Sequence, residues 1–270
     1  MNIGIISLGL IGGSVLKSLK NCEEYTLYAV TRNKKTIEEA KLYTPNISDD
    51  INTLKNCDVI FVCSPMSKVE EILDSLEKVV SPRTIVADVS SLKEFVTQKE
   101  RPYIFIGTHP MAGTEHCGFE SAFENLFEDA KWVITPSKLT DKSAISTLSS
   151  IIKKTGAQVI TAEAKEHDKA VALISHMPMF LAQALMKTAQ NNPLAMKLAS
   201  SGFKDMTRLA MSNTTMAQDM IALNNKNILT AINELEINSQ KLMNDNYPKE
   251  IEEIKTIRQK MYNQNGKNVF

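Results

Sequence analysis

Short apolar runs recur over the first 161 residues at the spacing that alternating strands and helices require. The runs are rich in valine, isoleucine and phenylalanine, and they occupy residues 2–7, 25–31, 58–64, 84–90, 104–108, 131–135 and 157–161. Helical or loop stretches separate them. This alternation predicts an α/β fold built on a doubly wound, mostly parallel sheet.

After this region the apolar residues recur at helical spacing. A first long helix is expected, with a kink at Pro178, because proline lacks an N–H and crowds the preceding turn. Two further helices are expected beyond Asn213. Their apolar stripes are Met216, Met220, Leu223, Ile228, Ile232 and Leu235, then Ile251, Ile254, Ile257 and Met261. Such stripes are typical of a core or a subunit interface. We therefore expect an all-helical domain over residues 162–270 that forms a homodimer.

Composition and charge limit the kinds of partner that the protein is expected to bind. The chain has 270 residues, 43% of them hydrophobic, and its 31 Lys and Arg balance its 31 Asp and Glu. We therefore expect no basic field for nucleic acid or a membrane surface. The sequence has no leader pattern, no apolar run near the roughly 20 residues of a membrane span, and scattered cysteines. These features predict a cytoplasmic protein with reduced thiols. The four histidines are spread out, so no metal site is expected.

A glycine-containing turn follows the first apolar run and opens a helix. A dinucleotide pyrophosphate binds N–H groups at such a helix N-terminus, where glycines let the backbone approach. Ser7 stands where the usual fingerprint has its first glycine, which a residue with a Cβ tolerates if its φ stays negative. The expected cofactor-binding residues are Ser7, Leu8, Gly9, Leu10, Ile11 and Gly12. They predict a dinucleotide-binding, Rossmann-like domain over residues 1–161; the alternative is a structural strand–helix connection.

The end of the second run bears on which cofactor binds. An acidic residue there would favour NAD, but the chain reads Thr31-Arg32-Asn33-Lys34-Lys35, with three cations and no carboxylate. Thr31 and Arg32 can bind a 2′-phosphate, so NADP is favoured over NAD. The alternative is a solvated basic loop.

Ser64 and Pro65 end the third run beside the expected cofactor cleft, and Ser64 is a candidate for the nicotinamide ribose. The alternative for Ser64 is helix N-capping.

His109 follows the fifth run, in the segment GTHPMAGTEHCGFESAFENLF at residues 107–127. It should lie just beyond the carboxyl end of a strand, where open α/β sheets bind ligands. Pro110 restricts the backbone beside His109, while Gly113 and Gly118 permit tight backbone paths around a small ligand. An imidazole held there is a candidate general base. The alternative is a loop histidine in contact with water.

The whole pattern is more specific than its parts. HPMAGTE, followed by Gly118, Ala122, Leu126-Phe127 and the later WVITP, resembles the central signature of the prephenate and arogenate dehydrogenases of tyrosine biosynthesis. The resemblance implies NAD(P)-dependent oxidative decarboxylation of a small-molecule substrate, prephenate or arogenate. Prephenate would give 4-hydroxyphenylpyruvate, with His109 taking the hydroxyl proton.

The same resemblance implies further site residues. Ser91 matches a serine that orients the histidine and the substrate hydroxyl, and Arg208 matches an arginine that pairs with a substrate carboxylate. Gly113, Thr114 and His176 are also assigned to substrate binding. For Ser91 the alternative is helix N-capping, for Arg208 a pair with Asp205, and for His176 a place in the core. Relatives carry a second histidine where this chain has Met179.

Three other functions remain open from sequence. The substrate could be arogenate, or both arogenate and prephenate. A β-hydroxyacid dehydrogenase or imine reductase would share the architecture, but would carry a catalytic lysine on a helix after the sheet. A non-catalytic nucleotide-sensing protein would account for Ser7 and Met179 as departures from the family pattern.

Overall fold

The computed structural model describes residues 1–114, 116–243 and 247–262. Glu115 of the HPMAGTE motif therefore lies outside the described residues. The chain divides into two compact units, Met1–Asn225 and Lys226–Phe270. The first unit thus combines the sheet with the helices that follow it directly, a different division from the expected boundary after residue 161.

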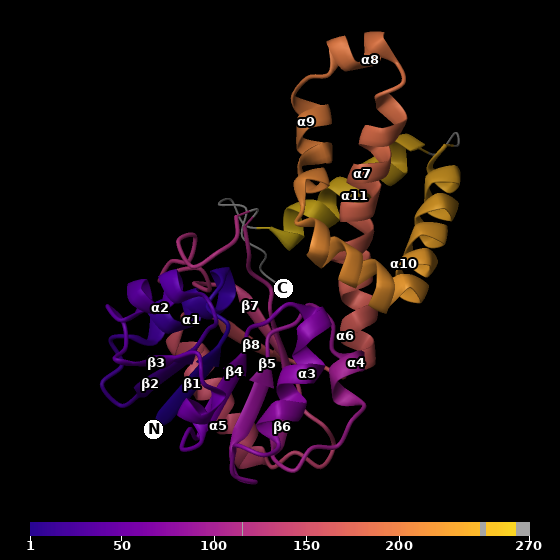
Figure 1. Ribbon diagram of the computed structural model, residues 1–270. Helices are drawn as coiled ribbons and strands as arrows, with labels where there is room; N and C mark the ends of the chain where they lie inside the picture. Colours follow the sequence, from indigo (N-terminus) through magenta and orange to yellow (C-terminus); the bar gives the residue numbers. More distant parts are fainter. Residues whose placement is uncertain (115, 244–246, 263–270) are drawn as a thin grey trace. The chain divides into compact units, whose positions relative to one another are not determined.

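The first unit is built on one eight-stranded sheet (Figure 1). Its strands are β1 (Asn2–Ile6), β2 (Thr26–Val30), β3 (Asn46–Ser48), β4 (Val59–Val62), β5 (Ile85–Asp88), β6 (Ile104–Pro110), β7 (Lys131–Thr135) and β8 (Gln158–Thr161). They lie in the order β3-β2-β1-β4-β5-β6-β7-β8, and every pair is parallel except β6 with β7. The predicted fold class is confirmed. The short edge strand β3 was not among the predicted runs.

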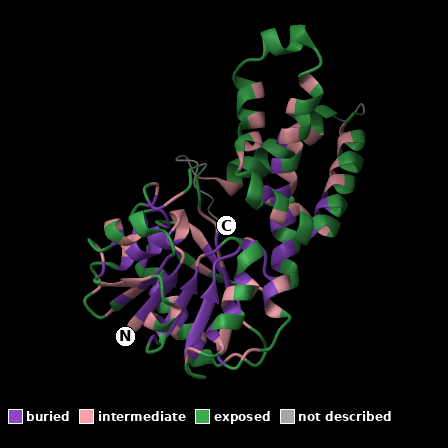
Figure 2. Ribbon diagram, in the orientation of Figure 1, coloured by how far each residue is buried: buried purple, intermediate pink, exposed green. Residues whose placement is uncertain are grey.

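Helices cover both faces of this sheet, because alternate residues of the strands face opposite ways. Phe61 of β4 belongs to the same buried cluster as residues of helices α1 (Leu10–Leu19) and α5 (Lys142–Lys154). Its neighbours Ile60 and Val62 belong to a second cluster, with α3 (Met66–Leu76). The strands form the buried centre (Figure 2). Two shorter helices complete this region, α2 (Lys34–Ala40) and α4 (Glu94–Thr97), with a 3-10 turn η1 (Ile51–Leu54).

A nearly continuous helical run begins after β8 and is distorted just before Pro178. It consists of α6 (Ala164–Val171), a π-helical turn η2 (Ala172–His176) and α7 (Met177–Ala189), in which Pro178 lies in the first turn. A proline early in a helix is tolerated, since its missing N–H needs no partner there. The distortion expected at Pro178 therefore takes the form of a π turn preceding it.

The run Ala164–Ala189 is long and apolar enough to cross a membrane, by length and composition alone. This finding corrects the expectation that no apolar run in the sequence approaches the length of a membrane span. Val171 and Met179 on this run pack in a buried cluster with Met66 and Leu92, which come from the sheet region. Since the core helix of a domain meets the same criteria, this packing accounts for the apolar character of the run.

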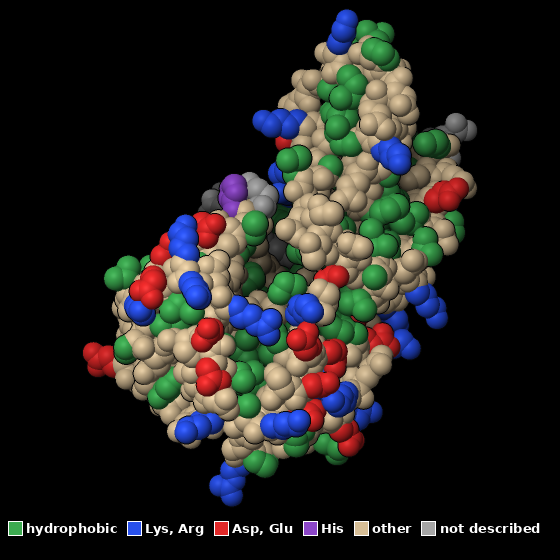
Figure 3. All heavy atoms as spheres, viewed as in Figure 1, with side chains coloured by type: hydrophobic (Ala, Val, Ile, Leu, Met, Phe, Trp, Pro, Cys, Tyr) green, Lys and Arg blue, Asp and Glu red, His purple; other side chains and the backbone are tan. Residues whose placement is uncertain are grey.

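Further helices complete the described part of the chain. They are α8 (Pro193–Leu198), α9 (Ser201–Thr207), a 3-10 turn η3 (Arg208–Met211), α10 (Thr214–Leu242) and α11 (Tyr247–Met261). The two helices predicted beyond Asn213 correspond to α10 and α11. Large apolar side chains are exposed on these helices (Figure 3). They include Leu194, Leu198 and Met206 in the first unit, and Ile237, Ile254 and Ile257 in the second.

Candidate active site

His109 is the last residue but one of β6. It was expected just beyond the strand, but the antiparallel pairing with β7 continues through His109 and Pro110, which lie opposite Val133 and Trp132. The side chain is partly buried. The imidazole is thus carried by a hydrogen-bonded strand, a more rigid support than a loop.

A histidine–aspartate pair from α6 holds His109. Nδ1 of His109 lies 3.0 Å from Nε2 of His167, and Nδ1 of His167 lies 2.8 Å from Oδ1 of Asp168. His167 and Asp168 are 4% and 3% exposed. The Asp168 carboxylate also accepts the backbone N–H groups of Lys93 at 2.8 Å and Glu94 at 2.9 Å. His167 and Asp168 were not among the site residues predicted from the sequence.

A buried ion pair contacts Thr108, the residue before His109. Lys93 and Asp88 are both fully buried; Nζ of Lys93 donates to Oδ2 of Asp88 and, at 2.6 Å, to the carbonyl of Thr108. The Thr108 N–H donates to Oδ1 of Asp88 at 3.2 Å. These bonds join the ends of β5 and β6, so they fix the backbone on which His109 stands.

Burial and neighbouring charge keep His109 neutral. Burial is the first cause that holds the pKa of His109 well below its usual range, and His167, Lys93 and His176 add to it. A neutral imidazole is the form that can accept a proton. The site therefore has a base available at neutral pH.

Ser91 lies between β5 and α4 and is partly buried. In the described part of the chain no hydrogen bond joins it to His109, whose Nδ1 is taken by His167. Lys93, not Ser91, is the N-cap residue of α4. The capping alternative is therefore not observed, and the role of Ser91 towards the substrate hydroxyl stays a prediction.

The turn after β1 differs from expectation at Ser7. Its φ is 69°, in the left-handed region, where a negative value was expected. The turn requires this conformation, and a residue with a Cβ adopts it at a cost of about 1 kcal/mol or more. The Ser7 hydroxyl lies 2.6 Å from that of Ser64, and this hydrogen bond compensates part of the cost. Pro65, not Ser64, is the N-cap residue of α3, so N-capping by Ser64 is not observed.

The N-terminus of α1 fits a pyrophosphate. Gly9 is its N-cap residue and offers no side chain, and among the described atoms none lies within 4 Å of where a Gly9 Cβ would be. A Cβ at Gly12 would lie 2.2 Å from the Ser7 carbonyl, so the helix can pack this closely only with glycine there. Leu8 is buried, and Leu10 and Ile11 pack against the core. Backbone N–H groups are thus left for an anionic ligand.

The basic segment that follows β2, residues 31–35, is partly held by hydrogen bonds within the protein. Thr31 is buried, and its N–H donates to the Ser48 carbonyl at 3.0 Å. Asn33 caps α2 by accepting the Thr36 N–H at 3.2 Å. The Arg32 side chain is exposed and makes no hydrogen bond or ion pair with any residue that the structure describes. It is therefore available to a ligand.

His176 and Met179 lie in the interior. His176 is fully buried, with Nδ1 3.2 Å from Nδ2 of Asn224, and burial lowers its pKa to about 4. This placement favours the core alternative over a substrate contact. Met179 is 4% exposed and packs with Met220 and other apolar residues. The methionine side chain at this position therefore fills an apolar cluster.

The remaining predicted substrate residues do not meet His109 in any described contact. Gly113 and Thr114 are exposed; Gly113 has open space around it and no positive φ, whereas Gly118 has a φ of 90°. Of the two glycines, only Gly118 therefore has the left-handed backbone conformation that favours glycine. Arg208, at the start of η3, is exposed and pairs neither with Asp205 nor with another described residue.

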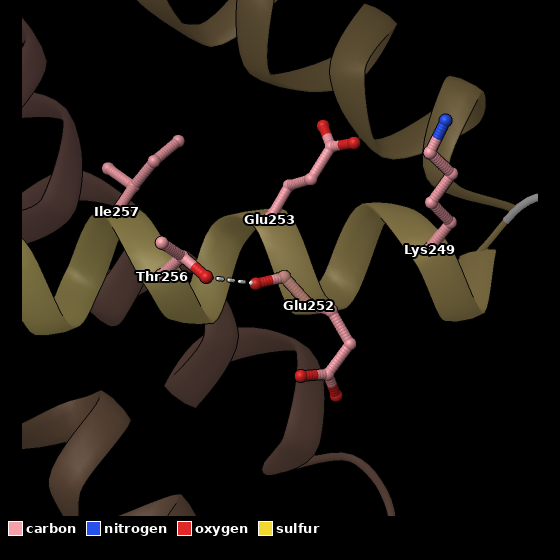
Figure 4. Close-up of a pocket in the computed structure, with 5 residues that line it drawn as sticks. All are labelled: Lys249, Glu252, Glu253, Thr256 and Ile257. Carbon is pink, nitrogen blue, oxygen red and sulfur yellow. Dashed lines mark hydrogen bonds between the residues drawn. The ribbon is translucent and has the colours of Figure 1, made fainter.

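A hollow on α11 carries none of the predicted site residues. It is lined by Lys249, Glu252, Glu253, Thr256 and Ile257 (Figure 4). Its hydrogen bond from Thr256 to the Glu252 carbonyl, at 2.9 Å, stays within one helix. Across residues 1–114, 116–243 and 247–262 no group of three or more His, Cys, Asp or Glu is placed to hold a metal ion.

Comparison with known proteins gives matches over both regions of the chain. Residues 15–161 match the prephenate dehydrogenase nucleotide-binding domain, and residues 163–264 match the prephenate dehydrogenase dimerization domain. The chain is 30% identical over 247 residues to the prephenate dehydrogenase of Bacillus subtilis, covering 85% of this chain and 66% of that protein. It is 27% identical to the cyclohexadienyl dehydrogenase of Zymomonas mobilis, covering 89% and 87%. The chain spans slightly less than two thirds of the Bacillus protein.

Two solved structures agree with these matches. Arogenate dehydrogenase from Synechocystis superposes with a TM-score of 0.81 at 31% identity, covering 96% of each chain. Prephenate dehydrogenase from Aquifex aeolicus, in complex with hydroxyphenyl propionate and NAD+, gives 0.82 at 28% identity, also covering 96% of each. With both domains matched, this chain belongs to the prephenate dehydrogenase family.

Proposed function

We propose that this protein oxidatively decarboxylates prephenate to 4-hydroxyphenylpyruvate with a nicotinamide cofactor. The observation that carries the proposal is the neutral His109, held by His167 at the end of β6 within the HPMAG motif. The exposed lysines of α6, Lys165 and Lys169, do not occupy the position that His167 takes. The site is therefore built around histidine, unlike the catalytic lysine expected of a β-hydroxyacid dehydrogenase.

In this reaction a bound nicotinamide would supply the acceptor for the hydride that leaves the ring carbon bearing the hydroxyl group. His109 takes the hydroxyl proton, so the oxygen can form a carbonyl as hydride leaves. Loss of carbon dioxide then returns an electron pair to the ring, and the phenolate formed regains a proton. Ser91 would hold the hydroxyl, and Arg208 a carboxylate. The Gly9 turn would hold the pyrophosphate through its backbone N–H groups.

Replacing His109 with Asn should lower turnover by roughly 100- to 10,000-fold, the usual contribution of a general base. The measurement is kcat for cofactor reduction, followed by absorbance, beside cofactor affinity from fluorescence titration. Affinity should stay unchanged. His116→Asn, the same substitution in the exposed part of the following loop, is the matched control and should keep its activity. Near-normal turnover of the His109 variant would contradict the assignment.

Replacing Arg208 with Ala should raise KM for substrate far more than KM for cofactor. Arg208→Lys should restore KM for substrate poorly, because a bidentate contact with a carboxylate needs the planar guanidinium. Steady-state titration of both ligands provides the measurement. Lys204→Ala removes an exposed cation from the same helical segment and should leave both constants unchanged. Equal effects of the Arg208 change on the two constants, or full rescue by Lys, would indicate a structural role.

The Gly9 turn can be tested separately from catalysis. Gly9→Ala should leave the melting temperature unchanged, because its φ of −93° suits alanine and the Cβ enters open space. The same Cβ would lie where the backbone meets the pyrophosphate, so Kd for the cofactor should rise at least tenfold. Gly202→Ala on α9 also enters open space and is the control. Unchanged cofactor affinity in the Gly9 variant would place the pyrophosphate elsewhere.

NADP should be preferred over NAD. The free Arg32 guanidinium can add one charge-assisted bond to a 2′-phosphate, worth about 1.5 to 3 kcal/mol, or roughly a ten- to hundredfold preference. We expect kcat/KM to be higher with NADP and Arg32→Ala to narrow the difference. Lys35→Ala should do little, because Lys35 pairs with Glu39 at 3.6 Å. A tenfold advantage for NAD in the wild type would contradict this interpretation.

The second candidate activity is oxidation of arogenate, alone or beside prephenate. It is favoured by the likeness to the Synechocystis arogenate dehydrogenase and the Zymomonas cyclohexadienyl dehydrogenase. Comparing kcat/KM for the two substrates decides between them. Turnover with neither, despite cofactor binding, would support the nucleotide-sensing alternative.

We also propose that the protein is a homodimer through its helical region. The matched dimerization domain and the exposed apolar residues support this assembly. Light scattering after gel filtration should give twice the mass of one chain. Leu198→Glu with Met206→Glu should shift the protein towards monomer if α8 and α9 contribute. A wild-type monomer at micromolar concentration would contradict the assembly.

A further inference from the structure

We propose that His167 and Asp168 fix the tautomer of His109, so that Nε2 of His109 is the atom that accepts the substrate proton. The inference rests on the proposed function for its catalytic consequence. The tautomer itself can be observed without turnover.

Asp168 accepts hydrogen bonds on both carboxylate oxygens. Its Oδ1 faces the Lys93 N–H and Nδ1 of His167, and its Oδ2 faces the Glu94 N–H. Backbone N–H groups can only donate, so the carboxylate is an acceptor on both oxygens. Nδ1 of His167 therefore donates to it.

A neutral imidazole has one donor nitrogen and one acceptor nitrogen. With Nδ1 of His167 protonated, its Nε2 carries the lone pair. The contact of 3.0 Å with Nδ1 of His109 is then a hydrogen bond only if His109 donates. Nε2 of a neutral His109 must therefore be bare and free to accept a proton.

Neighbouring groups do not compete for these atoms. The Lys93 ammonium is occupied by Asp88 and the Thr108 carbonyl, and His176 turns Nδ1 towards Asn224. Asn224 also donates to the Asp168 backbone carbonyl at 2.9 Å, which steadies α6 at this residue. The depressed pKa of His109 agrees with a neutral ring. With both imidazoles in the neutral form, the chain from Asp168 through His167 to His109 thus has one consistent set of donors and acceptors.

During reaction, the proton arriving at Nε2 makes His109 an imidazolium. Its Nδ1–H remains hydrogen-bonded to Nε2 of His167, whose Nδ1 is bonded to the Asp168 carboxylate, so the new positive charge is stabilised by an acceptor that is already in place. His167 and Asp168 are therefore positioning residues and need not touch the substrate. In a serine-protease triad, replacing the aspartate with asparagine leaves the histidine in the wrong tautomer and lowers kcat by about 10,000-fold.

The first experiment reads the tautomers directly. Nitrogen-15 NMR of histidine-labelled protein, with only four histidines to assign, distinguishes bare from protonated ring nitrogens. We expect Nδ1 protonated and Nε2 bare in both His109 and His167. A protonated Nε2 in neutral His109 would overturn the inference, whatever the activity. The expected tautomers without any turnover would instead count against the proposed function alone.

The second experiment links the tautomer to rate. His167→Gln offers an amide oxygen near the place of Nε2 and should keep kcat within about tenfold, whereas His167→Leu removes the acceptor and should lower kcat at least a hundredfold. Both should leave KM for cofactor and substrate within a few fold. Glu166→Gln, whose partner is the exposed Lys169, is the control on the same helix. A folded His167→Leu with near-normal kcat, or equal losses for Gln and Leu, would overturn the inference.

Discussion

The buried charge of Lys93 is the constraint on which the site depends. An ammonium without solvent must be paired, and Lys93 meets this need with Asp88 at the end of β5 and the Thr108 carbonyl on β6. Its backbone N–H donates to Asp168 of α6. One residue thus joins two strands and the first helix after the sheet. Losing one partner of such a buried pair costs about 3 to 5 kcal/mol, so this arrangement has little freedom to vary.

Much of the fold was predictable because buried strands have a recognisable pattern of apolar residues in the sequence. Strands enclosed on both faces read as apolar runs, and the glycine turn and His109 could be placed from their positions after such runs. The short edge strand β3 lacks that pattern, since its residues are only partly buried. The direction of β7 also has no local signal, and it is this antiparallel pairing that draws His109 into the strand.

The site was less predictable where partners come from distant segments. His167 follows His109 by 58 residues, and neither its spacing nor its neighbours link the two. Its pairing with His109 depends on how α6 packs against α4 and β6. Ser7 shows another limit: the sequence showed a missing glycine, but the turn kept its positive φ and gained a hydrogen bond to Ser64. Met179 likewise stands where the resemblance implied a histidine, and the structure shows it filling an apolar cluster.

The π turn at Ala172–His176 determines where this chain can lose a residue without disturbing the packing around it. A π turn holds one residue more than the α-helical turn it replaces, and one residue corresponds to a rotation of about 100° around a helix. Deleting a single residue within the turn would restore a regular α-helical turn and leave α7 nearly unrotated relative to His167 and Asp168, because the turn itself accommodates the extra residue. Met179 would then stay in its buried cluster, whereas the same deletion elsewhere in the run would rotate it away. The π turn is thus the place where the run can lose a residue without changing the rotation between its His167 end and its Met179 end.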